Sequence, residues 1–175
     1  MRTAILSATL LALASAAHAV DLGPLAPAAG GKVQCFSPNP AAKSCQSIGA
    51  YRVTPEGVIE NEATVMVSDS PLIIMTTRAP VKIKAGADCG VLSAKDLLAS
   101  SFTLDGHLAG PVETTRLRAA MRNRMGPVLG HEICVSYRPQ GESLLATSTV
   151  DGSARPDMDQ KVIWVPAADG WKVGY

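Results

Sequence analysis

The chain has 175 residues, with 16 Lys and Arg against 15 Asp and Glu. This length suits one domain with a sizeable core, and the near-neutral charge argues against a general nucleic-acid or membrane-surface binder. Beyond the N-terminal segment, no apolar stretch approaches the roughly 18 to 20 residues that a membrane-spanning helix needs, so we expect no membrane span in the mature chain.

The first nineteen residues have the pattern of a secretory signal peptide. Arg2 provides a positive start, residues 4–14 are largely apolar, and residues 17–19 read Ala-His-Ala, which matches the A-x-A cleavage pattern. We therefore expect cleavage after Ala19 and a soluble protein that is periplasmic or secreted. The alternative is an uncleaved N-terminal anchor, which the shortness of the apolar run disfavours.

Residues 20–31 are rich in Ala, Pro and Gly and carry almost no charge. This composition predicts a flexible linker that need not pack. A single domain is then expected over residues 32–175.

The chain has an even number of cysteines, which in an exported protein predicts disulfide bonds; they are Cys35, Cys45, Cys89 and Cys134. Four cysteines allow three pairings, of which we favour Cys35–Cys45 and Cys89–Cys134. No C-x-x-C motif is present, so neither a metal site nor a thioredoxin-like redox role is predicted. A catalytic cysteine would need an unpaired thiol, which the even count disfavours.

The first half of the domain is rich in strand signals. Candidate strands cover residues 48–53, 58–67, 72–77, 81–84 and 89–92, and residues 54–57 (Thr-Pro-Glu-Gly) form a turn between the first two. Residues 81–84 alternate between apolar and charged side chains, which is typical of a half-buried strand.

The middle of the chain has helix signals. Ser93 and Asp96 resemble a capping box and predict a short helix that ends near Ser100. A principal helix is expected over 112–125, where three apolar residues recur at every fourth position, before a Gly-Pro stop. We expect that stripe to pack on a sheet.

The last third returns to strands, with candidates over 131–137, 144–150 and 161–165 and a C-terminal hairpin that ends with 171–175. Strands, then one principal helix, then strands predict a disulfide-stabilised α+β fold. Its sheet should be mostly antiparallel, because most links are too short for crossovers, and a curved or barrel-like sheet is left open.

The densest charge feature is a group of arginines on the principal helix, namely Arg116, Arg118, Arg122 and Arg124. Such a group could bind an anion, for which a carboxylate, a phosphate or an acidic partner would serve. The alternative, which we weigh more heavily, is a solvated helix face whose later arginines complement the helix dipole.

Beyond the predicted signal peptide the chain has two histidines, His107 and His131. Either could serve in a hydrolase if the fold placed it beside a carboxylate, but no catalytic motif surrounds them. We therefore assign no catalytic residue and no cofactor.

Two further groups admit a functional interpretation. Asp151, Asp157 and Asp159 lie in a turn-rich segment that could hold calcium, although a polar loop fits the spacing better. Trp164 and Trp171 could form a ligand cage, but packing is the preferred interpretation.

The Cys35–Cys45 spacing, the Ile-Gly-Ala-Tyr run at 48–51 and the Asp-Gly-Trp near the end resemble small exported bacterial proteins of uncharacterised function. The resemblance rests on no catalytic motif and implies no site residue. The leading functional hypothesis is a non-enzymatic binding or envelope-interaction module, whose partner is an unknown protein or a small anionic ligand. The alternatives are a small hydrolase that uses His107 or His131 and an inhibitor of an exported enzyme that uses the Cys35–Cys45 loop.

Overall fold

The computed structural model describes residues 20–174, so the predicted signal peptide lies outside the described residues. The longer strands are β1 (Lys32–Phe36), β3 (Ser47–Val53), β4 (Ile59–Asp69), β5 (Leu72–Lys84), β6 (Ala87–Val91), β7 (Ser101–Leu104), β9 (Glu132–Gln140), β10 (Ser143–Val150) and β12 (Gln160–Pro166). Two-residue strands are β2 (Ser44–Cys45), β8 (His107–Leu108), β11 (Ser153–Ala154) and β13 (Lys172–Val173). The helices are α1 (Ala94–Ala99) and α2 (Pro111–Met125), with 3-10 segments η1 (Gly23–Gly30), η2 (Pro156–Met158) and η3 (Ala167–Asp169).

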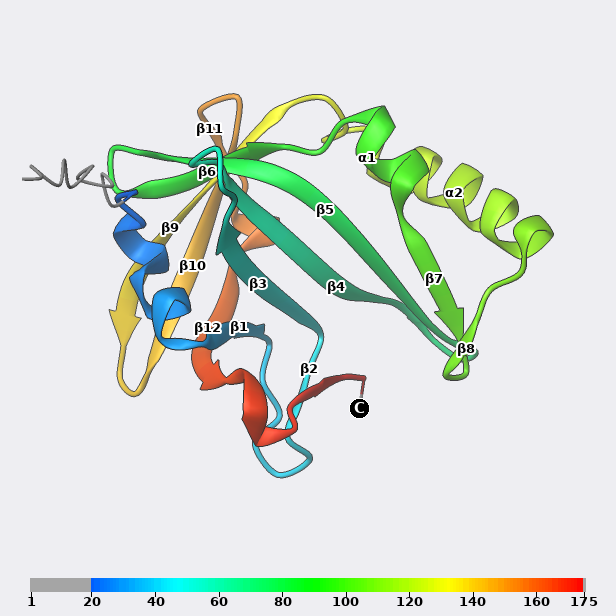
Figure 1. Cartoon of the computed structure of the whole chain (residues 1–175), viewed down its shortest axis with the longest axis horizontal. Helices are drawn as coiled ribbons and strands as arrows, with labels where there is room; N and C mark the ends of the chain where they lie inside the picture. Colours follow the sequence, from blue (N-terminus) through cyan, green and yellow to red (C-terminus); the bar gives the residue numbers. More distant parts are fainter. Residues whose placement is uncertain (1–19, 175) are drawn as a thin grey trace, which may run out of the picture.

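The main sheet closes on itself as an antiparallel barrel of eight strands (Figure 1). Around the barrel the order is β4-β3-β1-β12-β10-β9-β6-β5, and β5 pairs again with β4. The first long strand of the domain, β1, thus pairs with the last long strand, β12, and Gln34 is opposite Trp164 in the register. The prediction of an α+β fold is therefore wrong, because the helices do not cover an open sheet and closure leaves an interior.

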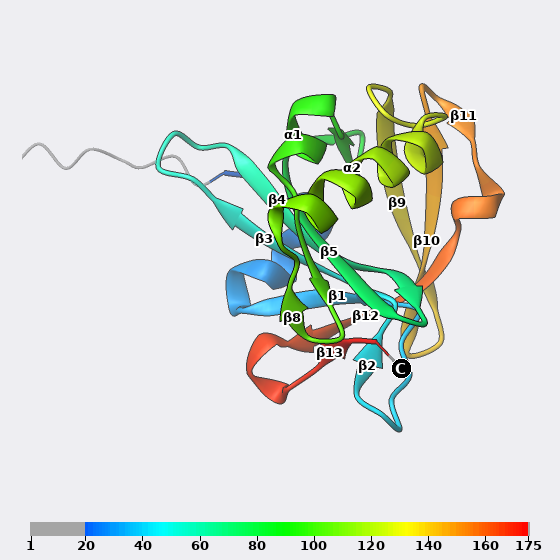
Figure 2. The same ribbon diagram turned by 90° about the vertical axis from the view of Figure 1, so that its right-hand side faces the viewer.

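The β4–β5 hairpin is longer than the barrel and carries a second layer outside it (Figures 1 and 2). One half of β5 pairs with β6 over Val81–Lys84, whereas its first half pairs with β7 over 73–76. On this extension α1, α2 and β7 enclose a core made of Met75, Leu97, Phe102 and Met121, which adjoins the barrel interior through Met75. Both helices lie where the sequence predicted them, and the Ser93–Asp96 capping box is present.

Residues 23–30, which were expected to belong to a flexible linker, form η1 instead. Leu25 at its centre is completely buried, with 0% of its surface exposed. This segment contacts β1, β3 and β6. Because β6 is not a neighbour of β1 or β3 in the barrel, η1 lies across one end and closes it. Packing of one leucine orders a segment whose composition is typical of linkers.

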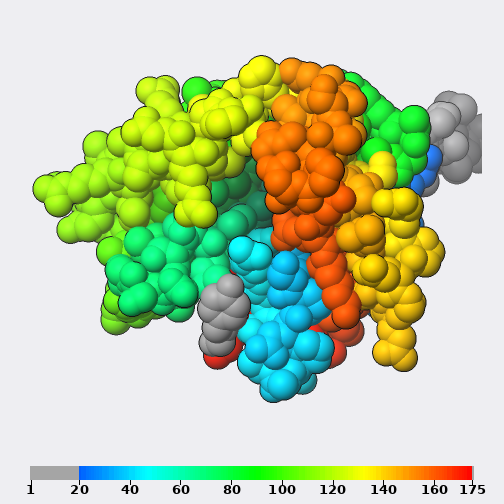
Figure 3. Space-filling view, turned by 180° about the vertical axis from the view of Figure 1, so that it is seen from behind, coloured from blue at the N-terminus to red at the C-terminus, as the bar shows by residue number. Residues whose placement is uncertain are grey.

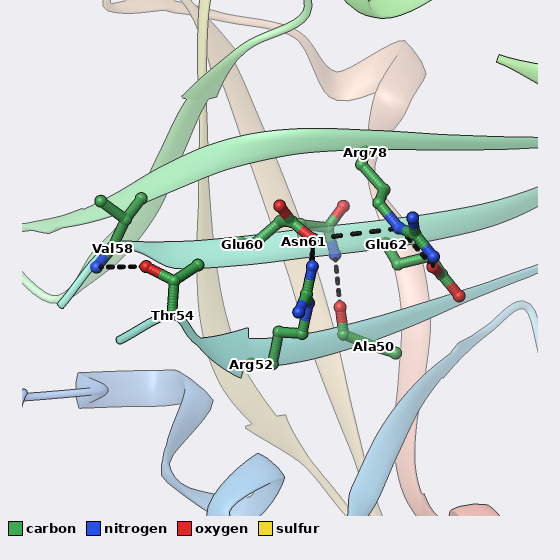
Figure 4. A network of polar contacts seen from close by, with 8 residues as sticks. All are labelled: Ala50, Arg52, Thr54, Val58, Glu60, Asn61, Glu62 and Arg78. Carbon is green, nitrogen blue, oxygen red and sulfur yellow. Dashed lines mark hydrogen bonds and ion pairs between the residues drawn. The ribbon is translucent and has the colours of Figure 1, made fainter. Parts of the chain in front are cut away.

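The outer face of β3, β4 and β5 carries a ladder of charged side chains (Figure 4). Arg52 donates a hydrogen bond from Nε to Oε1 of Glu60 at 2.9 Å, and Arg78 donates from Nε to Oε2 of Glu62 at 2.6 Å. The arginines are largely exposed and the glutamates partly exposed, so each pair contributes little to stability. Their main consequence is a polar exterior opposite the barrel interior.

The C-terminal segment does not form the expected hairpin. Residues 172–173 of β13 instead pair in parallel with β2, and Trp171 packs beside the Cys35–Cys45 disulfide and Val165. The second disulfide joins Cys89 on β6 to Cys134 on β9, at directly paired positions. These are the two pairings that the sequence favoured. No helix within residues 20–174 combines the length and apolar character needed to cross a membrane.

Candidate functional site

The barrel interior contains a cavity of about 290 Å³. At the barrel end opposite η1, the cavity is lined by Phe36, Ser47 and Gln160, together with Met125 from the end of α2. The surface is hollowed on this side, between the end of α2, the segment around η2 and residues 37–44 (Figure 3). The cavity is therefore closed by η1 at one end and approached from solvent at the other.

Strand alternation sends apolar side chains into most of this cavity. Alternate residues line it over 61–65 of β4 and 75–81 of β5, namely Asn61, Ala63, Val65, Met75, Thr77, Ala79 and Val81. Strand β9 contributes Ile133, Val135 and Tyr137. Small residues such as Ala63 and Ala79 leave the space that larger side chains would fill. The walls are thus suited to an apolar body.

Deeper in the barrel, four strands bring polar side chains together. The hydroxyl of Tyr51 donates a hydrogen bond to Oε1 of Gln34 at 2.8 Å, and the hydroxyl of Tyr137 donates to the same oxygen at 3.3 Å. Asp88 on β6 lies beside Tyr137 and lines the cavity. We call Gln34, Tyr51, Asp88 and Tyr137 the polar cluster.

The polar cluster does not satisfy all of its own hydrogen-bonding groups. Nε2 of Gln34 and Oδ1 of Asp88 are buried and have no hydrogen-bond partner within the described part of the chain. Gln34 is 0% exposed and Asp88 is 7% exposed. A buried polar group without a partner costs free energy, and such groups are rare enough in folded proteins to need an explanation.

Burial shifts the ionisation of this cluster. Loss of water raises the pKa of the Asp88 carboxyl from 3.8 to about 6, and the nearby hydroxyl of Tyr137 opposes that change only in part. The pKa of Tyr51 is raised well above its usual value, first by burial and then by the nearby Tyr137 and Asp88. Burial also raises the pKa of Tyr137, which therefore keeps its proton. At neutral pH the cluster holds one carboxylate and two neutral phenols.

The residues that line the cavity decide which contacts a bound molecule would make. Its lining includes no histidine, cysteine, lysine or arginine among residues 20–174. A carboxylate and two phenols can orient a bound molecule through hydrogen bonds, while the apolar walls bury its body.

The two histidines lie outside the cavity. His107 is exposed on β8, at the edge of the extension. His131 places Nδ1 2.6 Å from Oδ2 of Asp151, so the fold does bring it beside a carboxylate, but both side chains are about half exposed. The His131 bond lowers the pKa of Asp151, as expected for a surface pair.

The three aspartates of the 151–159 segment do not converge on one point. Asp157 binds the guanidinium of Arg155, whereas Asp159 accepts a hydrogen bond from the backbone of Ser148 at 3.1 Å. Asp151 is already engaged with His131. Each carboxylate thus has its own partner, as in the polar loop that the spacing favoured.

Two of the four arginines of α2 bind backbone carbonyls, and the other two are exposed. Arg118 donates to the backbone carbonyl of Ser100 at 2.8 Å, and Arg124 donates to that of Val67 at 3.1 Å, so both tie the helix to the extension. Arg116 and Arg122 are exposed. Anion binding by this group stays a prediction.

The tryptophans lie apart in two different environments. Trp164 lies near Tyr51, with ring centroids 6.4 Å apart, whereas Trp171 covers the Cys35–Cys45 disulfide. All four cysteines are in disulfides, so the sulfurs of Cys89 and Cys134 are not free to bind a metal beside Glu132.

Sequence reasoning missed the polar cluster. Only Tyr137 carried a signal, because it shares a face with Ile133 and Val135 in an alternating strand. Gln34, Tyr51 and Asp88 are unremarkable in sequence, and no motif links them. The chain matches no family model, no curated protein and no solved structure, so the site is interpreted from its own geometry.

Proposed function

We propose that this protein is a non-enzymatic binding protein that holds a small, largely apolar ligand inside its barrel. The observation that carries the proposal is a cavity with one open end, apolar walls and incompletely satisfied polar groups in its depth. Eight-stranded barrels are wide enough to accommodate one small ligand, and apolar pockets with a few convergent polar groups are the usual form of such sites.

The geometry favours binding over the hydrolase alternative. A hydrolytic site that uses His107 or His131 would need that histidine within hydrogen-bond reach of the substrate. Neither His107 nor His131 lines the cavity, and the His131–Asp151 pair lies on the surface.

We further propose that the protein works in the periplasm or outside the cell. The support is the predicted signal peptide together with two disulfides, which persist in oxidising compartments.

The experiment is a titration with indole, a neutral aromatic small enough for the cavity, followed by NMR chemical shifts of the backbone amides. We expect the largest changes at residues that line the cavity, such as Tyr51, Met75 and Ile133. In Ala63→Phe the added ring occupies the cavity, so the affinity for indole should fall by about tenfold or more.

The matched control is Ala120→Phe, which adds the same ring to an exposed position of α2 and should leave indole binding unchanged. Binding of indole to the Ala63→Phe variant with undiminished affinity, or chemical-shift changes confined to the exterior, would contradict the proposal.

A further inference from the structure

We propose that the ligand of the barrel cavity is a small apolar amine, whose ammonium group pairs with the carboxylate of Asp88. This inference rests on the proposed function, because it names the class of ligand for the same cavity. Three observations carry it: the separation of Asp88 from the cationic side chains of residues 20–174, its place on the cavity wall, and the size and character of the remaining space.

Asp88 is the only charged residue among the described residues that line the cavity. Only 7% of its surface is exposed to solvent. A carboxylate in such surroundings is costly unless a cation or several hydrogen bonds compensate it. Its Oδ1 has no hydrogen-bond partner among residues 20–174, so these residues leave the compensation incomplete.

None of the described strands and helices packed against Asp88 places a cationic side chain beside it. On β5 the residue paired with Asp88 is Ile83, while Lys82 pairs with Cys89 on the outer face and Lys84 binds Glu132. On β9 the paired residue is Val135. The remaining polar neighbours are the phenols of Tyr51 and Tyr137, which are hydrogen-bonded to Gln34. The 3-10 segment η1 contributes no charged residue.

The remaining space limits the body of the amine. The cavity of about 290 Å³ exceeds the roughly 150 Å³ of an engineered apolar cavity that binds benzene. One saturated or aromatic ring with a short substituent therefore fits. The walls of Val65, Met75, Val81 and Ile133 would bury that ring.

The charge of Asp88 distinguishes amines from other ligands of the same shape. An ammonium group gains a charge-assisted hydrogen bond, an alcohol gains only a neutral donor, and a carboxylic acid brings a second negative charge into the cavity. The expected order of affinity at neutral pH is therefore amine, then alcohol, then acid.

The test compares three ligands that share one ring, namely cyclohexylamine, cyclohexanol and cyclohexanecarboxylate, by NMR titration at pH 7.5. We expect the amine to bind about tenfold or more tightly than the alcohol, and the acid to bind most weakly. In Asp88→Asn the advantage of the amine over the alcohol should disappear. Asp151→Asn, which removes an exposed carboxylate, should leave all three affinities unchanged.

A second measurement uses the unaltered protein. Cyclohexylamine remains protonated throughout, and among the described residues that line the cavity Asp88 is the group that gains a proton when the pH is lowered from 7.5 to 5. The ratio of amine to alcohol affinity should therefore fall as the pH passes below about 6, the pKa of Asp88.

The outcomes separate this inference from the proposed function. If cyclohexanol binds in the cavity as tightly as cyclohexylamine, or the acid binds more tightly, the amine inference is overturned and the cavity remains a binding site. An amine advantage that survives both Asp88→Asn and pH 5 overturns it as well. If neither indole nor any member of the series binds in the cavity, both proposals fail.

Discussion

Asp88 costs the folded protein stability at neutral pH. Its carboxyl is buried without a cation, which raises its pKa from 3.8 to about 6. Because the folded state holds this proton more tightly than the unfolded chain, the free energy of unfolding declines as the pH rises between about 4 and 6. A buried group that lowers the stability of the folded state in this way is typical of binding sites, where function is gained at the expense of stability.

Replacement of Asp88 by Asn should therefore stabilise the protein relative to wild type in a pH-dependent way. The difference in free energy of unfolding between variant and wild type should grow by about 2 kcal/mol from pH 4 to pH 7, because most of the 3.8-to-6 change in pKa falls within that interval. Urea unfolding at both pH values measures this difference.

The control at this scale is Asp151→Asn. The pKa of Asp151 is lowered by His131 on the surface, so its favourable contribution is lost as the pH falls through that lowered value, the opposite direction to Asp88. If the Asp88→Asn difference were the same at pH 4 and pH 7, Asp88 would not be the strained carboxylate described above.

At the scale of elements, η1 shows how one side chain decides the state of a segment. Its sequence, Gly-Pro-Leu-Ala-Pro-Ala-Ala-Gly, has little intrinsic preference for order. Leu25 buries its whole side chain against the barrel, and that burial compensates the loss of backbone freedom. The element closes the barrel end nearest the polar cluster.

Replacement of Leu25 by Ala should lower the free energy of unfolding by about 3 kcal/mol, because a fully buried leucine loses its contacts and leaves a void. Urea unfolding measures the loss. Leu98→Ala on α1, where the side chain is 58% exposed, should change stability by less than about 0.5 kcal/mol. Equal effects of the two substitutions would show that η1 does not pack as described.

At the scale of the whole molecule, the barrel is closed by pairings between distant parts of the chain and is reinforced by two disulfides. Cys35–Cys45 spans 10 residues, whereas Cys89–Cys134 spans 45 and joins adjacent barrel strands. A cross-link that closes a longer loop removes more freedom from the unfolded chain.

The double variants Cys35→Ala/Cys45→Ala and Cys89→Ala/Cys134→Ala should accordingly differ in stability. We expect losses of about 3 and about 4 kcal/mol respectively, from loop length alone. Both variants lose the same atoms, so urea unfolding of the two compares the loops directly. A larger loss for the 35–45 pair would contradict this account, and the unreduced wild type should titrate no free thiol.

Local features of this chain could be predicted from the sequence. The capping box at Ser93 and the Gly-Pro stop after Met125 mark the ends of α1 and α2, because capping and termination depend on neighbouring residues. Alternation placed Ile133, Val135 and Tyr137 on one face, and that face is the barrel interior. The even cysteine count also predicted disulfides without knowledge of the fold.

The barrel and its polar cluster depended on the tertiary structure. Periodicity shows which residues of a strand share a face, but it does not say that β1 pairs with β12 or that β4 pairs on both sides. Gln34, Tyr51, Asp88 and Tyr137 come from four strands spread over a hundred residues of chain, and only closure brings them into contact. The sequence by itself determined the helices and the cysteine content, because those are local properties. The interior cavity was decided only by long-range pairing, which no local pattern encodes.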